Sequence, residues 1–379
     1  MSRAVGLIAG EASGDLLGAE LIAALKSHKP ELQFEGIAGP KMTAAGALAL
    51  ASSERLSVNG YVEVLRHLPG LLKLRRDIVK HFLGHLPRVF VGIDAPDFNF
   101  GVEERLKAAG IPTVHFVSPS IWAWRGERIH RINKAVSHML VVFPFEAEIY
   151  EKAGIPVTYV GHPLADRLPL EPDVAGARMK LELESSGPVI ALLPGSRQGE
   201  VKRLAPILLQ AARIILQARP AARFVMPAAT DAVKSVLQTL VRDSSLPIRV
   251  LDGQSHEAMT AADVVVLASG TATLEAALLK KPMVITYRIP AITYWLAKGK
   301  LYLPWVGLPN ILLRRFAVPE LLQENATPEK IAQATLDWLD APKKCAELAA
   351  EFRSLHETLR CNASERIAEA LMPFLEQEL

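Results

Sequence analysis

The sequence predicts an α/β protein made of two Rossmann-like, doubly wound domains that face a central cleft, with a helical C-terminal tail. Three observations predict this fold. The length of 379 residues fits two ordinary domains better than one. Short apolar runs alternate with longer amphipathic stretches, and this alternation restarts after a polar, proline-marked segment near residue 165. Ligands of such sheets bind at the carboxyl ends of the strands, so the informative residues are expected to follow strands.

The expected domains span 1–165 and 166–341, and further helices are expected over 342–379. Apolar runs in the first domain predict buried parallel strands at Val5–Ala9, Phe34–Ala38, Val89–Ile93, Thr113–Val117 and Met139–Phe143. Those in the second domain predict strands at Val189–Leu193, Arg223–Met226, Ile248–Leu251, Val264–Leu267 and Met283–Thr286. The pattern is helical from about Pro328 onward. These last helices are expected to pack on the N-terminal domain or on a partner subunit, so a homodimer is an open alternative.

Composition excludes several classes of protein. With 50% hydrophobic and 22% charged residues the chain is globular and not disordered. A net charge of +3 does not favour nucleic-acid binding. The two cysteines, Cys345 and Cys361, indicate reduced thiols in a cytosolic protein. The uncharged stretch Leu301–Leu313 is interrupted by two prolines and is too short for a membrane span.

Two loops that follow strands in the first domain carry polar side chains. The loop Gly10–Asp15 has glycine spacing that matches neither a dinucleotide fingerprint nor a P-loop. Either Asp15 or Ser13 caps the next helix, or the loop forms a cleft wall that meets a sugar or phosphate. Asp94 follows a buried strand directly, so it is expected to point into the cleft and is the better candidate for a general base.

Asp97 and Asn99 lie close behind Asp94 and could bind hydroxyl groups, although one of them could instead cap the helix that begins near Phe100. The segment holds no D-x-D metal pair, which favours a metal-independent mechanism. Farther on, Ser118–Arg125 places tryptophans beside arginines. These side chains could hold acyl chains and a phosphate, or they could be core tryptophans before a solvated basic helix.

Two glycine-containing loops of the second domain each join a strand to a helix, at Leu192–Glu200 and Ala268–Glu275. Such loops offer backbone N–H groups to an anion, and an arginine lies inside the first one. Gly253, which also follows a strand, is placed to contact a base. Together these loops predict a site for a nucleotide diphosphate.

The sequence resembles the lipid A disaccharide synthases, inverting glycosyltransferases of the GT-B type, over essentially its full length. The motifs that carry the resemblance are Gly10–Asp15, Val91–Asn99, Ser118–Arg125, Gly161-His162-Pro163, Leu192–Glu200, Ala268–Glu275, Leu308-Pro309-Asn310 and Arg360-Cys361-Asn362. The resemblance implies transfer of 2,3-diacylglucosamine from UDP to 2,3-diacylglucosamine 1-phosphate (lipid X), without a cofactor or metal. The implied location is the cytoplasmic face of the inner membrane of a Gram-negative bacterium, where the protein would be peripheral.

The resemblance also implies roles for residues. Asp94 would be the catalytic base. The acceptor would be bound by Glu11, Ser13, Asp97, Asn99, Ser118, Trp124 and Arg125. UDP-sugar would be bound by Gly195, Ser196, Arg197, Gly253, Ser269, Gly270, Thr271, Glu275 and Asn310.

Acylated substrates would require contact with a membrane, and one segment has a suitable composition. It combines basic residues with Val62, Val64, Leu65, Leu68 and Leu72, which is typical of an interfacial helix on anionic lipid. The alternative is a core-facing amphipathic helix with a basic outer face. Two other functions stay open: a UDP-sugar transferase or epimerase acting on a soluble amino sugar, and a non-catalytic nucleotide-sugar-binding protein.

Overall fold

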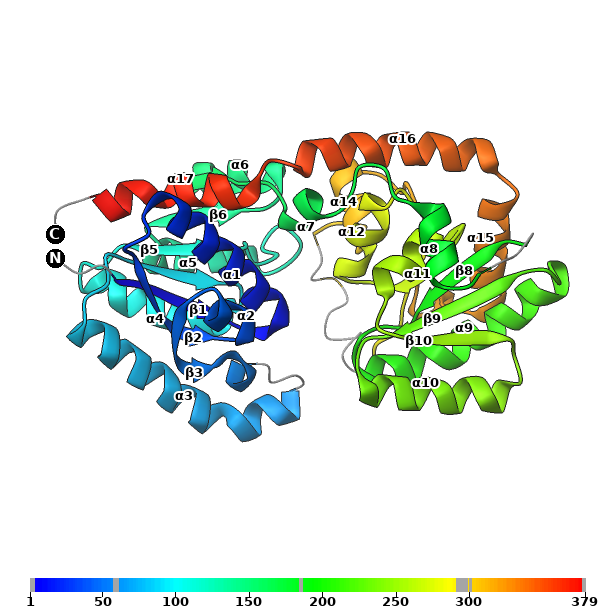
Figure 1. Cartoon of the computed structure of the whole chain (residues 1–379), viewed down its shortest axis with the longest axis horizontal. Helices are drawn as coiled ribbons and strands as arrows, with labels where there is room; N and C mark the ends of the chain where they lie inside the picture. Colours follow the sequence, from blue (N-terminus) through cyan, green and yellow to red (C-terminus); the bar gives the residue numbers. More distant parts are fainter. Residues whose placement is uncertain (1–3, 57–60, 184–186, 291–298, 300–301, 377–379) are drawn as a thin grey trace. The chain divides into compact units, whose positions relative to one another are not determined.

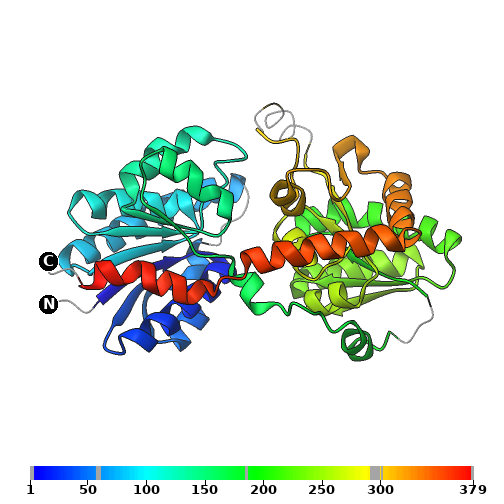
Figure 2. The same cartoon turned by 90° about the horizontal axis from the view of Figure 1, so that it is seen from above.

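The computed structural model describes residues 4–56, 61–183, 187–290, 299 and 302–376, without the side chains of Ala12 and residues 61–67. The chain divides into two compact units. Unit 1 combines Met1–Asp166 with Leu359–Leu379, and unit 2 is Arg167–Thr358. In each unit, helices cover both faces of a parallel sheet (Figures 1 and 2). The predicted fold class, two Rossmann-like α/β domains with a helical C-terminal region, is confirmed.

The sheet of unit 1 is parallel and has the strand order β3-β2-β1-β4-β5-β6-β7. Its strands are β1 Ala4–Ala9, β2 Gln33–Ala38, β3 Ala47–Ser52, β4 Val89–Ile93, β5 Thr113–Phe116, β6 His138–Val141 and β7 Val157–Tyr159. Strands β4 and β5 are buried along their whole length, as expected of a sheet covered on both faces. The polar loops after β1 and β4 therefore lie at one edge of this sheet, because β1 and β4 are parallel neighbours.

The helices of unit 1 are α1 Glu11–His28, α2 Pro40–Ala44, α3 Tyr61–Gly84, α4 Pro96–Ala108, α5 Ile129–Ala135, α6 Pro144–Lys152, α7 Pro163–Arg167 and α17 Ala363–Glu376, with short 3-10 turns at Ser53–Leu56 and Gly126–Arg128. Helix α17 packs beside α1 (Figures 1 and 2). His28 on α1 and Glu365 on α17 approach to 2.6 Å. The last helix of the chain is thus part of the first unit.

Asp15 does not cap the helix that contains it, so this part of the sequence interpretation was wrong. The N-cap of α1 is Gly10, which supplies no side-chain bond. The buried Asp15 carboxylate instead accepts hydrogen bonds from the backbone N–H groups of Gly39, Lys41 and Met42 at 2.9–3.0 Å. Asp15 therefore caps α2, a helix that is distant in sequence.

The sheet of unit 2 is also parallel, in the order β10-β9-β8-β11-β12-β13. Its strands are β8 Val189–Leu193, β9 Arg223–Ala228, β10 Ile248–Asp252, β11 Val264–Ala268, β12 Met283–Tyr287 and β13 Glu320–Leu322. Its helices are α8 Val174–Lys180, α9 Gln198–Ala218, α10 Asp231–Ser244, α11 Ser255–Ala261, α12 Thr271–Leu278, α14 Leu308–Leu313, α15 Pro328–Leu339 and α16 Pro342–Leu359, with a 3-10 turn at Gln323–Asn325. The helical stretch predicted from Pro328 onward is confirmed by α15, α16 and α17.

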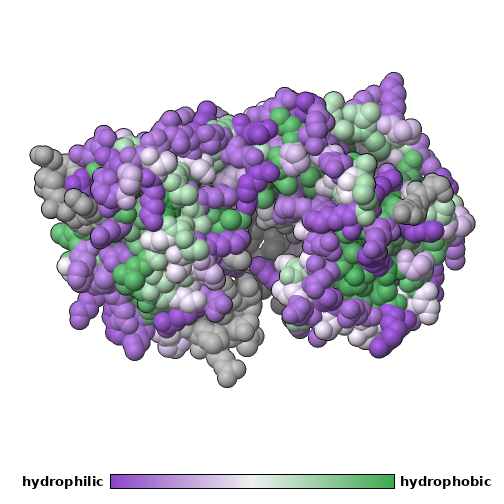
Figure 3. All heavy atoms as spheres, viewed as in Figure 1, coloured by the Kyte–Doolittle hydropathy of each residue, from purple (hydrophilic) through white to green (hydrophobic). Residues whose placement is uncertain are grey.

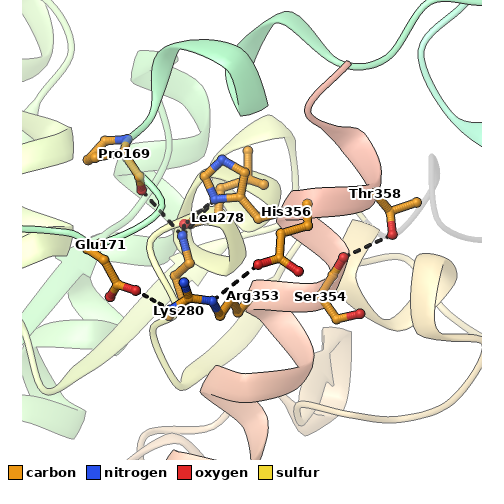
Figure 4. Close-up of polar contacts among 9 residues, drawn as sticks. Pro169, Glu171, Leu278, Lys280, Arg353, Ser354, His356 and Thr358 are labelled. Carbon is orange, nitrogen blue, oxygen red and sulfur yellow. Dashed lines mark hydrogen bonds and ion pairs between the residues drawn. The ribbon is translucent and has the colours of Figure 1, made fainter. Parts of the chain in front are cut away.

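The end of α16 is held against unit 2 by a cluster of polar contacts (Figure 4). Lys280 Nζ donates to the carbonyl of Leu278 at 2.6 Å and lies 2.7 Å from Nδ1 of the buried His356. Arg353 pairs with Glu171. These contacts fix α16 immediately before the chain continues into unit 1 at Leu359.

Candidate functional site

Unit 2 has a cavity of about 460 Å³ at the carboxyl ends of β8, β9, β10 and β11. Its lining is rich in small residues and includes hydroxyl and carboxylate side chains: Leu193, Gly195, Ser196, Glu200, Pro227, Ala228, Ala229, Gly253, Ser255, Ala268, Ser269, Gly270, Thr271, Ala272 and Glu275. This is the edge at which parallel sheets bind their ligands. Seven of the residues predicted for UDP-sugar binding lie together here: Gly195, Ser196, Gly253, Ser269, Gly270, Thr271 and Glu275.

Two helices begin at this cavity without a side-chain cap. Helix α9 follows Arg197, and α12 follows Gly270, and neither residue supplies a capping bond. Their first N–H groups and the positive ends of the helix dipoles are therefore available to an anion. Gly195 has φ +116°, and a Cβ there would lie 2.7 Å from Oε2 of Glu200, so this turn requires glycine. The arrangement suits a diphosphate.

Glu275 is a charged side chain that the sequence predicted for this cavity and that lines it. A histidine contacts one of its two carboxylate oxygens. Its Oε2 lies 2.9 Å from Nε2 of His256 on α11. The bond to Glu275 raises the pKa of His256, partial burial acts in the opposite direction, and Glu257 raises it further while Arg167 lowers it. One carboxylate oxygen is thus engaged by the imidazole while the residue still lines the cavity.

This pair has a measurable pH signature. Because the folded-state pKa of His256 is raised, the stabilisation from the pair is fully present below the unfolded-state pKa of about 6.5 and is lost as the pH rises through the folded-state pKa. An NMR titration of the His256 ring is expected to give a pKa above the usual value, and Glu275→Gln is expected to lower it. A His256 that titrates normally in the wild-type protein would contradict the pairing.

Two residues expected in the UDP-sugar site do not line this cavity. The Arg197 side chain is 57% exposed and lies 3.7 Å from Glu200. Asn310 is fully buried beyond the cavity wall. Its Nδ2 donates to the Val318 carbonyl at 2.9 Å and to Glu320 at 2.8 Å, while Oδ1 accepts from the N–H groups of Ala317 and Val318. All four hydrogen-bonding positions of this amide are occupied within the protein.

The bonds of Asn310 continue to the loop between β11 and α12, which contains Ser269. Glu320 accepts hydrogen bonds from the N–H groups of Val306 and Gly307 at 3.0 and 2.9 Å. The Val306 carbonyl in turn accepts from the Ser269 hydroxyl at 3.3 Å. Asn310 and Glu320 are therefore placed to position the loop around Ser269.

Unit 1 has a second cavity of about 460 Å³, at the carboxyl ends of β1 and β4. Its lining combines leucines with charged side chains: Gly10, Glu11, Leu56, Leu68, Leu71, Leu72, Arg75, Asp94, Ala95, Pro96, Asp97 and Phe98. Asp94, Asp97 and Glu11 thus share one cavity, as the sequence predicted from their positions after strands. An apolar wall beside carboxylates suits a ligand with both hydrocarbon and hydroxyl groups.

The backbone at this cavity is strained. Glu11, Asp94 and Ala95 have φ of +50°, +52° and +43°, in the left-handed region that disfavours residues with a Cβ. The side chain of Asn99, which is fully buried, donates to the carbonyl of Asp94 at 2.7 Å. Asn99 therefore holds the backbone of Asp94 and does not line the cavity. Ser13 is exposed in the first turn of α1 and is also outside the lining.

The loop Ser118–Arg125 lies outside both cavities and is fixed by buried polar contacts. The Ser118 hydroxyl lies 2.7 Å from that of Tyr150, and Trp122 Nε1 donates to Glu146 at 3.0 Å. Burial raises the pKa of Glu146 to about 7. Trp124 is 39% exposed, and its ring lies 4.2 Å from the guanidinium of Arg125. Trp122 is thus anchored by its bond to Glu146, while the ring of Trp124 is partly exposed beside Arg125.

The sequence interpretation assigned no role in the two cavities to three residues: Arg75 and Glu200, which line them, and His256, which pairs with Glu275. A signal existed for two of them, because Glu200 lies in the first turn of the helix after a glycine turn and His256 lies in the first turn of the helix after β10. Arg75 lies in the middle of a long basic helix, and no local pattern distinguishes it from its neighbours.

Two features are absent from the described ranges. No group of three or more His, Cys, Asp or Glu residues there could hold a metal ion. No helix in the part of the chain that the structure describes is long and apolar enough to cross a membrane.

Solved structures resemble the chain over almost its whole length. The UDP-GlcNAc 2-epimerase of Neisseria meningitidis bound to UDP-GlcNAc has a TM-score of 0.66 at 13% identity, and the match covers 98% of this chain and 100% of that one. MurG of Acinetobacter baumannii has a TM-score of 0.61 at 16% identity, with 98% and 99% covered. At such low identity these similarities concern the fold alone, and they agree with the predicted GT-B type.

Sequence relatives are much closer. The Lipid-A-disaccharide synthase of Methylobacillus flagellatus is 55% identical over 374 residues, which cover 98% of this chain and 99% of that protein. The Lipid-A-disaccharide synthase of Thiobacillus denitrificans is 59% identical over 370 residues, with 98% and 99% covered. A family model described as Lipid-A-disaccharide synthetase matches residues 5–371. Since this match spans nearly the whole chain, the protein belongs to the lipid-A-disaccharide synthetase family.

Proposed function

We propose that this chain transfers a 2,3-diacylglucosamine unit from UDP to the 6-hydroxyl of 2,3-diacylglucosamine 1-phosphate. The products are the β-1′,6-linked disaccharide 1-phosphate and UDP. Membership of the family makes the chain a glycosyltransferase. The observation that carries the proposal is that each unit has a cavity at the carboxyl ends of its strands, one formed around helix N-termini and the other lined by leucines and carboxylates.

The donor is assigned to the unit 2 cavity. The N–H groups that begin α9 and α12 would hold the diphosphate, and Glu275 would accept hydrogen bonds from the ribose hydroxyls. As the glycosidic bond to UDP breaks, negative charge grows on the diphosphate. A donor aimed at such charge contributes roughly 3 kcal/mol to transition-state stabilisation, so several together supply much of what a metal ion would.

The acceptor is assigned to the unit 1 cavity. Asp94 would take the proton from the acceptor 6-hydroxyl while that oxygen attacks the anomeric carbon from the face opposite UDP. The leucines of the same cavity, Leu56, Leu68, Leu71 and Leu72, would contact acyl chains. Asn99 supports this role from behind by holding the Asp94 carbonyl.

With acyl-chain substrates, the protein would work as a peripheral protein at the cytoplasmic surface of the inner membrane. Leu68 and Leu72 on α3 are 40% and 45% exposed, and hydrophobic side chains interrupt a mostly hydrophilic surface in Figure 3. The side chains of Val62, Val64 and Leu65, also expected at the membrane, lie outside the described residues. Exposed leucines on a basic helix fit anionic lipid.

One incubation tests the function directly. Purified protein is mixed with UDP-2,3-diacylglucosamine and 2,3-diacylglucosamine 1-phosphate in detergent micelles, and mass spectrometry follows both products. Disaccharide and UDP are expected in equal amounts. UDP without disaccharide, or turnover only of a soluble UDP-amino sugar, would contradict the proposal.

A further inference from the structure

An arginine on α3 lines the unit 1 cavity together with Asp94, and the established features of the site leave it without a role. Arg75 is half-buried. It is the only basic side chain in the described lining of that cavity, whose other charged members are Glu11, Asp94 and Asp97. A partly buried guanidinium that faces a cavity is a strong candidate to bind an anion.

The neighbouring helix is shaped to receive this side chain. A Cβ at Gly101 of α4 would lie 2.4 Å from Nη1 of Arg75 and 3.0 Å from its Cδ and Cζ. Glycine within a helix costs roughly 0.5–1 kcal/mol relative to alanine. Gly101 has no positive φ that would require glycine. The absence of a side chain at Gly101 therefore leaves room for the guanidinium of Arg75 to pack against α4.

The charges that act most strongly on Arg75 are mostly positive. Among the described residues no ion pair joins Arg75 to a carboxylate. Asp97 forms an ion pair with Arg128, and Glu104 forms one with Arg131, each with an N–O distance of 2.9 Å. Burial lowers the pKa of Arg75, repulsion from Arg105 and Arg131 lowers it further, and Glu104 opposes the shift. An unpaired cation among other cations is stabilised when an anion binds.

We propose that Arg75 binds the phosphate of the acceptor, a phosphomonoester on the sugar whose hydroxyl Asp94 deprotonates. This inference rests on the proposed function. A guanidinium donates two parallel hydrogen bonds to phosphate oxygens, and the leucines of the same cavity contact hydrocarbon, so one ligand with a phosphate and acyl chains satisfies the whole lining. Phospholipid head groups share this chemistry, and the test separates the two sources.

The first arm compares two acceptors. Arg75→Gln and the wild-type protein are assayed with 2,3-diacylglucosamine 1-phosphate and with the methyl glycoside that lacks the phosphate. Arg75→Gln is expected to lose about 10- to 100-fold in kcat/KM with the phosphorylated acceptor, as for one lost charge-assisted bond, and less than about 2-fold with the methyl glycoside. Equal losses with both acceptors would overturn the inference.

The matched control is Lys80→Gln, which removes one positive charge from an exposed position of the same helix. It is expected to match the wild-type protein with both acceptors. Both variants are also sedimented with phosphatidylglycerol vesicles, where equal binding is expected. If Arg75→Gln alone lost vesicle binding and did not distinguish the acceptors, the phosphate would belong to a membrane lipid and the inference would be wrong.

Gly101→Ala provides a variant that keeps the arginine and the fold. The added methyl group displaces the guanidinium from α4, whereas alanine favours the helix. The variant is expected to retain or raise Tm and to lose several-fold in kcat/KM with the phosphorylated acceptor only. Absence of disaccharide from the wild-type protein with either acceptor would contradict the proposed function. Normal wild-type turnover with an unchanged Arg75→Gln would contradict this inference alone.

Discussion

Asp94→Asn is expected to reduce kcat by about 100- to 10,000-fold and to leave the affinity for UDP unchanged. General-base catalysis typically contributes a rate factor of this size, and the amide cannot accept the proton. Asparagine tolerates the left-handed conformation that Asp94 adopts at φ +52°, so the loop should keep its shape. UDP binding should persist, because the donor is assigned to a cavity of unit 2. Steady-state kinetics and calorimetry measure the two quantities.

Asp97→Asn is the matched control for the identity of the base. Asp97 lines the same cavity, but its side chain is 77% exposed and paired with Arg128. An exposed pair of this kind is worth at most about 1 kcal/mol, so kcat is expected to change only a few-fold. A larger loss in Asp97→Asn than in Asp94→Asn would transfer the role of base to Asp97.

The central strands of both sheets could be predicted from sequence, while several edge strands could not. Strands such as β4 and β8 are buried on both faces, so their apolar runs are continuous. The strands that escaped prediction, β3, β7 and β13, each lie at the edge of a sheet. In β3 the leucines Leu48 and Leu50 are 62% and 37% exposed. A strand at the edge of a sheet is less buried, so its sequence need not be a continuous apolar run. The pattern that predicts a buried strand is therefore absent.

The residues of the candidate site also differ in whether local sequence could predict them. Residues that follow strands, such as Asp94, Ser269 and Gly270, could be predicted because the topology of a parallel sheet brings strand ends together. Arg75 and His256 depend on packing between helices distant in sequence, which local patterns do not encode. The resemblance implied that Asn310 binds UDP-sugar. Its hydrogen bonds instead favour a role in positioning the loop around Ser269.

The positioning role of Asn310 leads to the second prediction with a large expected effect. Asn310→Ala is expected to lower the free energy of unfolding by about 4 kcal/mol, because four hydrogen bonds at roughly 1 kcal/mol each are lost in a fully buried place. It should also weaken UDP binding, since Glu320 and Val306 would no longer hold Ser269 in place. Urea denaturation gives the stability, and calorimetry gives the UDP affinity.

Asn325→Ala is the control, since Asn325 is exposed and its one side-chain bond, from Lys330 at 2.6 Å, lies at the surface. Its loss is expected to cost less than about 1 kcal/mol and to leave UDP affinity unchanged. The two roles of Asn310 predict opposite patterns. A positioning role couples the loss of UDP affinity to a loss of stability, because the same four bonds carry both. Near wild-type stability together with a large loss of UDP affinity in Asn310→Ala would contradict the positioning role and favour the direct role implied by the resemblance.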